Sequence, residues 1–178
     1  MLEQQGLLLR PWRLAAPADK SHQAAAALTE PGTRNRDVLD LASGRELGFV
    51  RARQSPVWRG FRWLARRILE AYETEDASLV CSVTRSWGLA WGWEVCDAEE
   101  RRVAVVYRRL IVHSTGRALA VTEWPAESSP GHFLNPRGTE LGSFTSAPEG
   151  TSVTFAAILD GDPFSRMALL GAVLSYEW

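Results

Sequence analysis

The sequence predicts a single, mainly β domain (α+β): a closed antiparallel β-barrel of successive hairpins around a buried central C-terminal helix. Three observations predict it. A turn unit with the core Gly-x-Glu-Leu-Gly recurs between β-branched stretches, the last segment is apolar on nearly every side, and 178 residues suit one core. Closure hides the edge strands of hairpins in series, although the hairpins alone also permit a sandwich of two sheets.

The first turn unit shows why the repeat indicates a hairpin. Asp40 is followed by Gly44, which accepts the positive φ of a tight turn. The second glycine of the unit, Gly48, predicts a bulge or a close approach of two backbones. The clearest copies span 38–50 and 133–144, and more degenerate copies span 93–106 and 111–121.

The C-terminal segment predicts a helix that must be buried. Asp162 is a suitable N-cap and Pro163 a suitable first helical residue. From Phe164 to Tyr176 the helix is about 20 Å long, whereas a bilayer core is about 30 Å thick. Burial within the protein is therefore favoured over burial in lipid.

The chain before residue 34 is expected to be a poorly defined strand or arm (1–33), and the barrel domain is expected to span 34–178. Leu7 to Trp12 is compatible with a first strand. Residues 23–28 favour either a short surface helix or a poorly ordered arm, since alanine promotes helix and a terminal position permits disorder.

Residues 56–72 predict one amphipathic outer helix, near 57–72, with an apolar arc and a basic arc. Trp63 lies among the arginines, which suits a membrane interface where indole meets headgroups and guanidinium meets phosphate. The alternative is a solvated arginine face with Trp63 under a loop. The predicted lipid- or anion-binding residues are Arg59, Arg62, Trp63, Arg66 and Arg67.

Other patterns have structural interpretations that are favoured over functional ones. Asp160 and Asp162 are weak calcium candidates, because Ca²⁺ needs six to eight oxygen ligands and an N-cap explains Asp162. A ligand platform is less favoured than core packing for the three tryptophans near one predicted hairpin. These tryptophans are Trp87, Trp91 and Trp93.

Composition and motifs exclude several function classes. The net charge of −1 gives no overall attraction to nucleic acid, so no nucleic-acid partner is expected. The sequence has no nucleophile elbow, P-loop, dinucleotide fingerprint or metal-spaced histidines, so we expect a non-enzymatic domain without a cofactor or a metal. Without a signal sequence or an apolar run long enough to span a bilayer, a cytoplasmic protein, peripheral to the membrane at most, is expected.

Two cysteines are too few for a disulfide scaffold or a cysteine-rich metal site. A turn at Gly88-Leu89 would place Cys81 and Cys96 opposite each other on paired strands. A disulfide then needs favourable geometry, and two reduced, buried thiols are the favoured interpretation.

The order of these features resembles the family of tubby-like domains, phospholipid scramblases and LURP-one-related proteins. The matching residues are Asp40-x-x-x-Gly44-x-x-x-Gly48, the unit from Asp97 to Val106, and the ending from Met167 to Leu174, over roughly 34–178. The resemblance implies a barrel of about twelve strands threaded by the terminal helix. The chain lacks the scramblases' proline-rich region and cysteine cluster, and tubby's lysine- and arginine-lined phosphoinositide pocket.

From this resemblance and the arginines, we expect a non-enzymatic module that binds anionic phospholipid or a membrane surface. The alternatives are a protein-interaction or structural domain with an unknown partner and a small apolar-ligand carrier. The carrier ranks last, because the family's helix fills its barrel.

Overall fold

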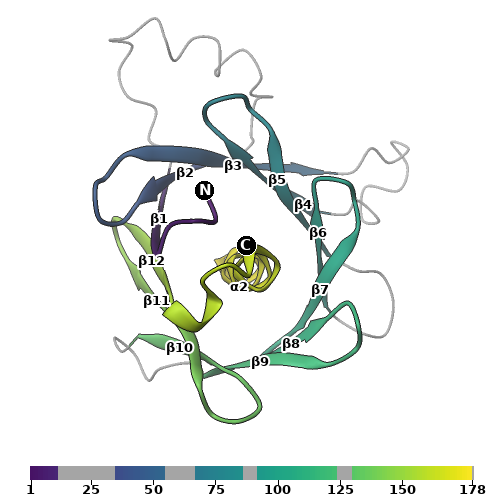
Figure 1. Cartoon of the computed structure of the whole chain (residues 1–178). Helices are drawn as coiled ribbons and strands as arrows, with labels where there is room; N and C mark the ends of the chain where they lie inside the picture. Colours follow the sequence, from purple (N-terminus) through teal and green to yellow (C-terminus); the bar gives the residue numbers. More distant parts are fainter. Residues whose placement is uncertain (12–34, 55–66, 86–91, 124–129, 178) are drawn as a thin grey trace, which may run out of the picture.

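The computed structural model describes residues 1–11, 35–54, 67–85, 92–123 and 130–177. Within these residues, antiparallel strands β1 to β12 form a closed barrel, in which β1 pairs with both β2 and β12 (Figure 1). Every other pairing joins strands that are consecutive in the chain. The predicted fold class is therefore confirmed. The strands are β1 (Gly6–Pro11), β2 (Asn35–Asp40), β3 (Glu46–Gln54), β4 (Arg67–Glu73), β5 (Leu79–Arg85), β6 (Trp93–Asp97), β7 (Arg102–Tyr107), β8 (Leu110–His113), β9 (Ala118–Glu123), β10 (Gly131–Leu134), β11 (Glu140–Ala147) and β12 (Gly150–Phe155).

Helix α2 (Pro163–Glu177) lies inside this ring of strands, as the view along the barrel in Figure 1 shows. It follows the short 3-10 helix η3 (Ala157–Leu159), and the side chains from Ser165 to Ser175 are all buried. Gly171 permits close packing, because a Cβ there would lie only 2.6 Å from a methyl carbon of Val95. The predicted buried terminal helix is confirmed.

The core forms between α2 and the alternate, inward-facing positions of the strands. The pleat sends successive side chains to opposite faces, so every second strand residue meets the helix. These inward side chains are fully buried and almost all apolar. They include Leu7, Leu9, Val50, Leu69, Val83, Val95, Ile111, Phe133 and Val153.

Five hairpins share one turn design, which explains the repeat in the sequence. Each has a register shift next to the turn and a residue with positive φ within it. In the first hairpin, Asp40 accepts hydrogen bonds from the backbone of Ala42 and Ser43, and Gly44 has φ +69°. The residues at the Gly44 position are Gly44, Ala77, Glu100, Gly116 and Gly138.

The second glycine of the unit allows two strands to approach closely, as predicted. A Cβ at Gly48 would lie 2.1 Å from the carbonyl oxygen of Tyr72, and one at Gly142 would lie 2.4 Å from that of Thr154. No side chain fits at either position without a shift of the neighbouring backbone.

The predicted outer helix at 56–72 is wrong over residues 67–72, which belong to strand β4. Leu69 and Ala71 point inward with a period of two, and β4 pairs with β3 on one side and β5 on the other. A short apolar run satisfies helical and strand periodicity alike, and here the strand pairing decides the outcome. Residues 56–66 lie outside the described residues.

The chain before residue 34 contributes to the barrel, contrary to the expected boundary. Strand β1 closes the ring between β2 and β12, with Leu7 opposite Val153. The expected strand from Leu7 is therefore part of the barrel, while residues 12–34 lie outside the described residues.

The two cysteines do not face each other. Cys81 pairs with Asp97, and Cys96 pairs with Ser82, so the two thiols lie on opposite faces of the sheet. Cys81 is buried inside the barrel, Cys96 is partly exposed outside it, and both are free. A disulfide between them is excluded by this register.

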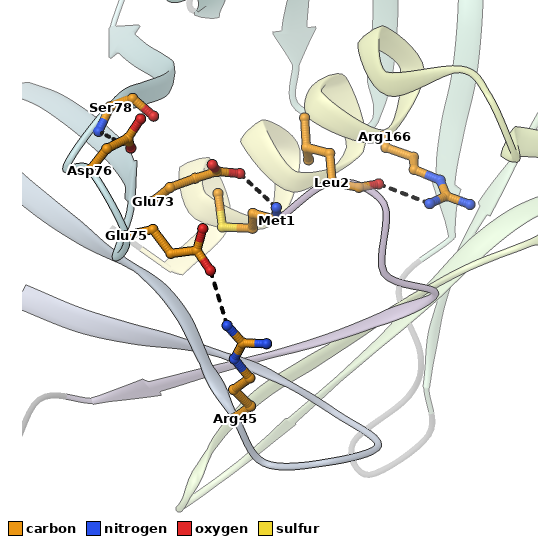
Figure 2. Close-up of polar contacts among 8 residues, drawn as sticks. All are labelled: Met1, Leu2, Arg45, Glu73, Glu75, Asp76, Ser78 and Arg166. Carbon is orange, nitrogen blue, oxygen red and sulfur yellow. Dashed lines mark hydrogen bonds and ion pairs between the residues drawn. The ribbon is translucent and has the colours of Figure 1, made fainter.

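Residues 1–5 lie across the end of the barrel at which α2 begins (Figure 2). Arg166 of α2 is buried, and its Nη1 donates to the carbonyl oxygens of Leu2, at 2.8 Å, and of Gln4, at 3.3 Å. Its Nη2 pairs with Asp160. These contacts join the start of the chain to the first turns of the central helix.

Candidate anion-binding end of the barrel

The two ends of the barrel differ in their connections. One end, which we call the capped end, holds the five similar turns, residues 1–5 and the start of α2. At the opposite end lie the β7–β8 turn, the β11–β12 turn and the end of α2. The β1, β3, β5 and β9 strands also finish there, so their following connections leave from that end.

Charge is distributed unequally between these ends. At the capped end, acidic residues outnumber the arginines Arg45, Arg101, Arg102, Arg117, Arg137 and Arg166. They are Glu3, Asp40, Glu46, Glu73, Glu75, Asp76, Asp97, Glu99, Glu100, Glu140, Asp160 and Asp162. The opposite half of the barrel, which we call the basic end, has the reverse excess. Among the described residues, its arginines are Arg10, Arg36, Arg51, Arg53, Arg67, Arg85, Arg108 and Arg109, against Asp37, Glu70, Glu94, Glu123, Glu149 and Glu177.

Three of these arginines lie at the rim of the barrel around the end of α2. Arg36, Arg67 and Arg85 are in phase with inward-facing residues of β2, β4 and β5, so they project from the inner side of the rim. Each takes part in an interaction within the chain. A helix ends with negative partial charge, which cations stabilise. Part of the basic charge therefore serves the fold.

A second group of arginines is held by carboxylates on the outer face of β1 to β4. Arg53 Nε donates to Glu70 Oε1 at 2.6 Å, and Arg10 pairs with Asp37 at 3.2 Å. The Glu70 carboxylate also accepts the hydroxyl of Tyr72 at 2.9 Å. Burial, followed by the hydrogen bond to Glu70 and its charge, raises the pKa of Tyr72. This network neutralises its own charge and fixes the outer face.

At the basic end, the β7–β8 turn carries two adjacent basic side chains without an acidic partner among the described residues. Arg108 and Arg109 are both exposed, and neither forms an ion pair with any residue that the structure describes. The sequence signal for this pair was two adjacent arginines between the apolar strands β7 and β8. The helical periodicity of residues 56–72 pointed to that segment as the binding surface, so the turn was not predicted.

Of the predicted binding residues, only Arg67 is described. It is exposed at the start of β4, at the basic end. Arg59, Arg62, Trp63 and Arg66 lie outside the described residues, so the structure neither groups nor separates them.

The two calcium candidates have structural roles. The Ser165 N–H donates to Asp162 Oδ1 at 3.0 Å, so Asp162 caps α2, and Asp160 pairs with Arg166. Nowhere in the described part of the chain do three or more His, Cys, Asp or Glu side chains gather as metal ligands would. Of the three predicted clustered tryptophans, Trp93 packs against the core, while Trp87 and Trp91 lie outside the described residues.

Comparison of the chain with protein-family models, curated proteins and solved structures gives no match. In the described ranges, no helix has the length and apolarity needed to cross a bilayer.

Proposed function

We propose that this barrel is a non-enzymatic module that binds anionic phospholipid at its basic end. The observation that carries the proposal is the separation of charge along the barrel, with unneutralised arginines in the β7–β8 turn. Arginine binds phosphate oxygens in a bidentate manner, and each basic residue near an anionic bilayer contributes about 1 kcal/mol. The net charge of −1 gives no general attraction, so orientation is essential to binding.

The fold supports the proposed kinship with tubby-like domains, scramblases and LURP-one-related proteins. The shared features are a closed barrel of twelve strands and one central C-terminal helix. Transport of lipid across a bilayer is not part of the proposal. The buried residues of α2 fill the described interior with apolar side chains, which argues for surface binding over a carrier role.

Vesicle co-sedimentation tests the proposal. The full chain is incubated with vesicles of phosphatidylcholine alone or of equal parts phosphatidylcholine and phosphatidylserine, at low and high salt. We expect association with the anionic vesicles only, and its loss at high salt, because salt screens exposed charges. Equal association with both vesicle types would contradict the proposal.

A matched pair of charge reversals locates the binding surface. Arg108→Glu with Arg109→Glu changes the basic end, and Arg117→Glu with Arg137→Glu makes the same change at the capped end. We expect the first pair to weaken association by at least about tenfold and the second pair to leave it unchanged. Equal effects from the two pairs would refute an oriented site, and thermal melting of each variant verifies the fold.

A further inference from the structure

An apolar row crosses the outer face of the barrel beside the β7–β8 turn. Tyr107 pairs with Leu110, and Leu110 pairs with Val121, so the three side chains share one face of the sheet. They are 37%, 38% and 40% exposed. Their neighbours along the strands point inward and are buried, namely Val106, Ile111 and Ala120.

Single exposed apolar residues are common, but three that adjoin on neighbouring strands form a patch. Charge distinguishes this patch from the other exposed apolar residues. The others are at the capped end: Leu41, at 41% exposure, follows Asp40, and Ile158 and Phe164, at 63% and 46%, lie beside Asp160 and Asp162. An anionic surface would be repelled there. The row from Tyr107 to Val121 instead adjoins Arg108 and Arg109, with Glu123 as the nearest acidic residue along β9.

The β7–β8 turn places an arginine at a position where the backbone favours glycine. Arg108 has φ +49°, a left-handed conformation that glycine adopts without steric cost. Glycine occupies the positive-φ position in three of the five capped-end turns, and Ala77 and Glu100 occupy it in the other two. Strained residues of this kind are concentrated at functional sites. Here the strain places a guanidinium at an exposed tip beside the apolar row.

We propose that the β7–β8 turn is the part of the basic end that enters an anionic bilayer. Tyr107, Leu110 and Val121 lie in the interface between headgroups and acyl chains, and Arg108 and Arg109 bind lipid phosphates. Tyrosine suits this depth because its ring is apolar and its hydroxyl polar. The proposal rests on the proposed function and names the inserting element.

Two variants separate insertion from simple attraction of charge. Leu110→Ser with Val121→Ser removes apolar area without changing charge, and Ile158→Ser with Phe164→Ser is the matched control at the capped end. With vesicles of equal phosphatidylcholine and phosphatidylserine, we expect the first pair to weaken association about tenfold. The control pair leaves it unchanged.

Arg108→Gly provides a test that leaves the apolar row unchanged. Glycine relieves the strained φ, so the melting temperature stays the same or rises, while vesicle association falls about fivefold with the loss of one basic residue. The control is Glu100→Gly, which relieves a φ of +60° at the capped end and should leave association unchanged.

The outcomes distinguish the two proposals. If the Arg108 and Arg109 reversals weaken association but the Leu110 and Val121 variant does not, insertion is refuted and the proposed function stands. If the wild-type chain does not associate with anionic vesicles, both the proposed function and the proposed insertion are refuted. A wild-type dimer in sizing chromatography that Leu110→Ser with Val121→Ser dissociates, with vesicle association unchanged, would assign the row to a second copy and overturn the inference.

Discussion

The amino group of Met1 lies 2.6 Å from Oε1 of Glu73, a residue 72 positions away in the chain (Figure 2). Glu73 ends β4, at the position that Asp40 occupies in the first hairpin. Asp40 caps its own turn, whereas Glu73 reaches inward to the start of the chain. In the β4–β5 hairpin, Asp76 instead accepts the backbone N–H of Ser78, at 2.9 Å. The β4–β5 turn therefore differs from the first hairpin, because the last residue of its leading strand binds the start of the chain.

This pairing predicts a stability difference between two neighbouring glutamates. Glu73→Gln should lower the free energy of unfolding by about 1 kcal/mol, since the partner amino group is buried. Glu75→Gln is the control, because Glu75 and its partner Arg45 are 83% and 71% exposed and such pairs contribute little. Urea denaturation measures both. Equal losses of unfolding free energy in the two variants would show that the Met1 contact stabilises the fold no more than an exposed ion pair does.

The third hairpin predicts that asparagine can replace its capping aspartate. Asp97 Oδ1 accepts the backbone N–H groups of Glu99 and Arg101, and Asn135 makes the same pair of bonds in its own turn. Asp97→Ala should therefore cost about 1–2 kcal/mol, and Asp97→Asn clearly less. Chemical denaturation that ranks Asn with Ala would contradict the shared turn design.

The same aspartate predicts a dependence on acid. Burial tends to raise the pKa of Asp97, but hydrogen bonds from Arg101 and its charge hold it below the usual 3.8. A lowered pKa in the folded state adds stability above the unfolded value, and this is lost as pH falls through the folded pKa. The stability gap between the wild type and Asp97→Asn should therefore shrink below about pH 4. A constant gap would rule out an ionised cap.

The central helix predicts that a single methyl group is harmful at Gly171. A Cβ there would lie 2.6 Å from Val95 Cγ2 and 3.0 Å from Cγ1. Gly171→Ala gains about 1 kcal/mol of helix propensity, but overpacking costs about 1–3 kcal/mol, so we expect a net loss. Pairing it with Val95→Ala, which opens space, should recover part of that loss. Stabilisation by Gly171→Ala alone would contradict close packing of α2 on β6.

The register of β5 and β6 predicts different behaviour for the two thiols. Burial, with a smaller effect of Cys96, raises the pKa of Cys81 from 9.0 to about 12. The unfolded thiol ionises first, so stability is intact below pH 9 and falls as pH rises toward 12. Cys81→Ala should reduce that alkaline loss, measured by urea denaturation on either side of pH 9. A thiol reagent should modify Cys96 before Cys81 in the folded protein, and the reverse order would contradict the register.

The sequence predicted the features that one physical effect determines alone, namely the burial of α2 and the glycine-containing turns. Helix α2 is apolar on nearly every side and follows the N-cap Asp162, so only a buried helix fits. The hairpins carry glycines where φ is positive, which is how Gly44 and Gly138 were recognised. Ala77 and Arg108 adopt positive φ without that signal, and their turns were not predicted, whereas the turn at Glu100 was recognised only as a degenerate copy of the unit.

The errors in prediction arose where tertiary pairing decides the structure. Leu69 and Ala71 fit a helical arc and a strand face equally well, and only pairing with β3 and β5 selects the strand. A turn centred on Gly88-Leu89 would pair Cys81 with Cys96, but the observed register is displaced by one residue. That displacement sends the two side chains to opposite faces.

Hydrogen exchange with and without anionic vesicles tests the oriented binding of this barrel most directly. With vesicles of equal phosphatidylcholine and phosphatidylserine, we predict slower exchange in a peptide covering residues 107–110. Peptides covering the capped-end turns at 97–101 and 135–139 should be unchanged. Slower exchange at the capped end, or no change at 107–110 under conditions in which the protein sediments with the vesicles, would contradict the account.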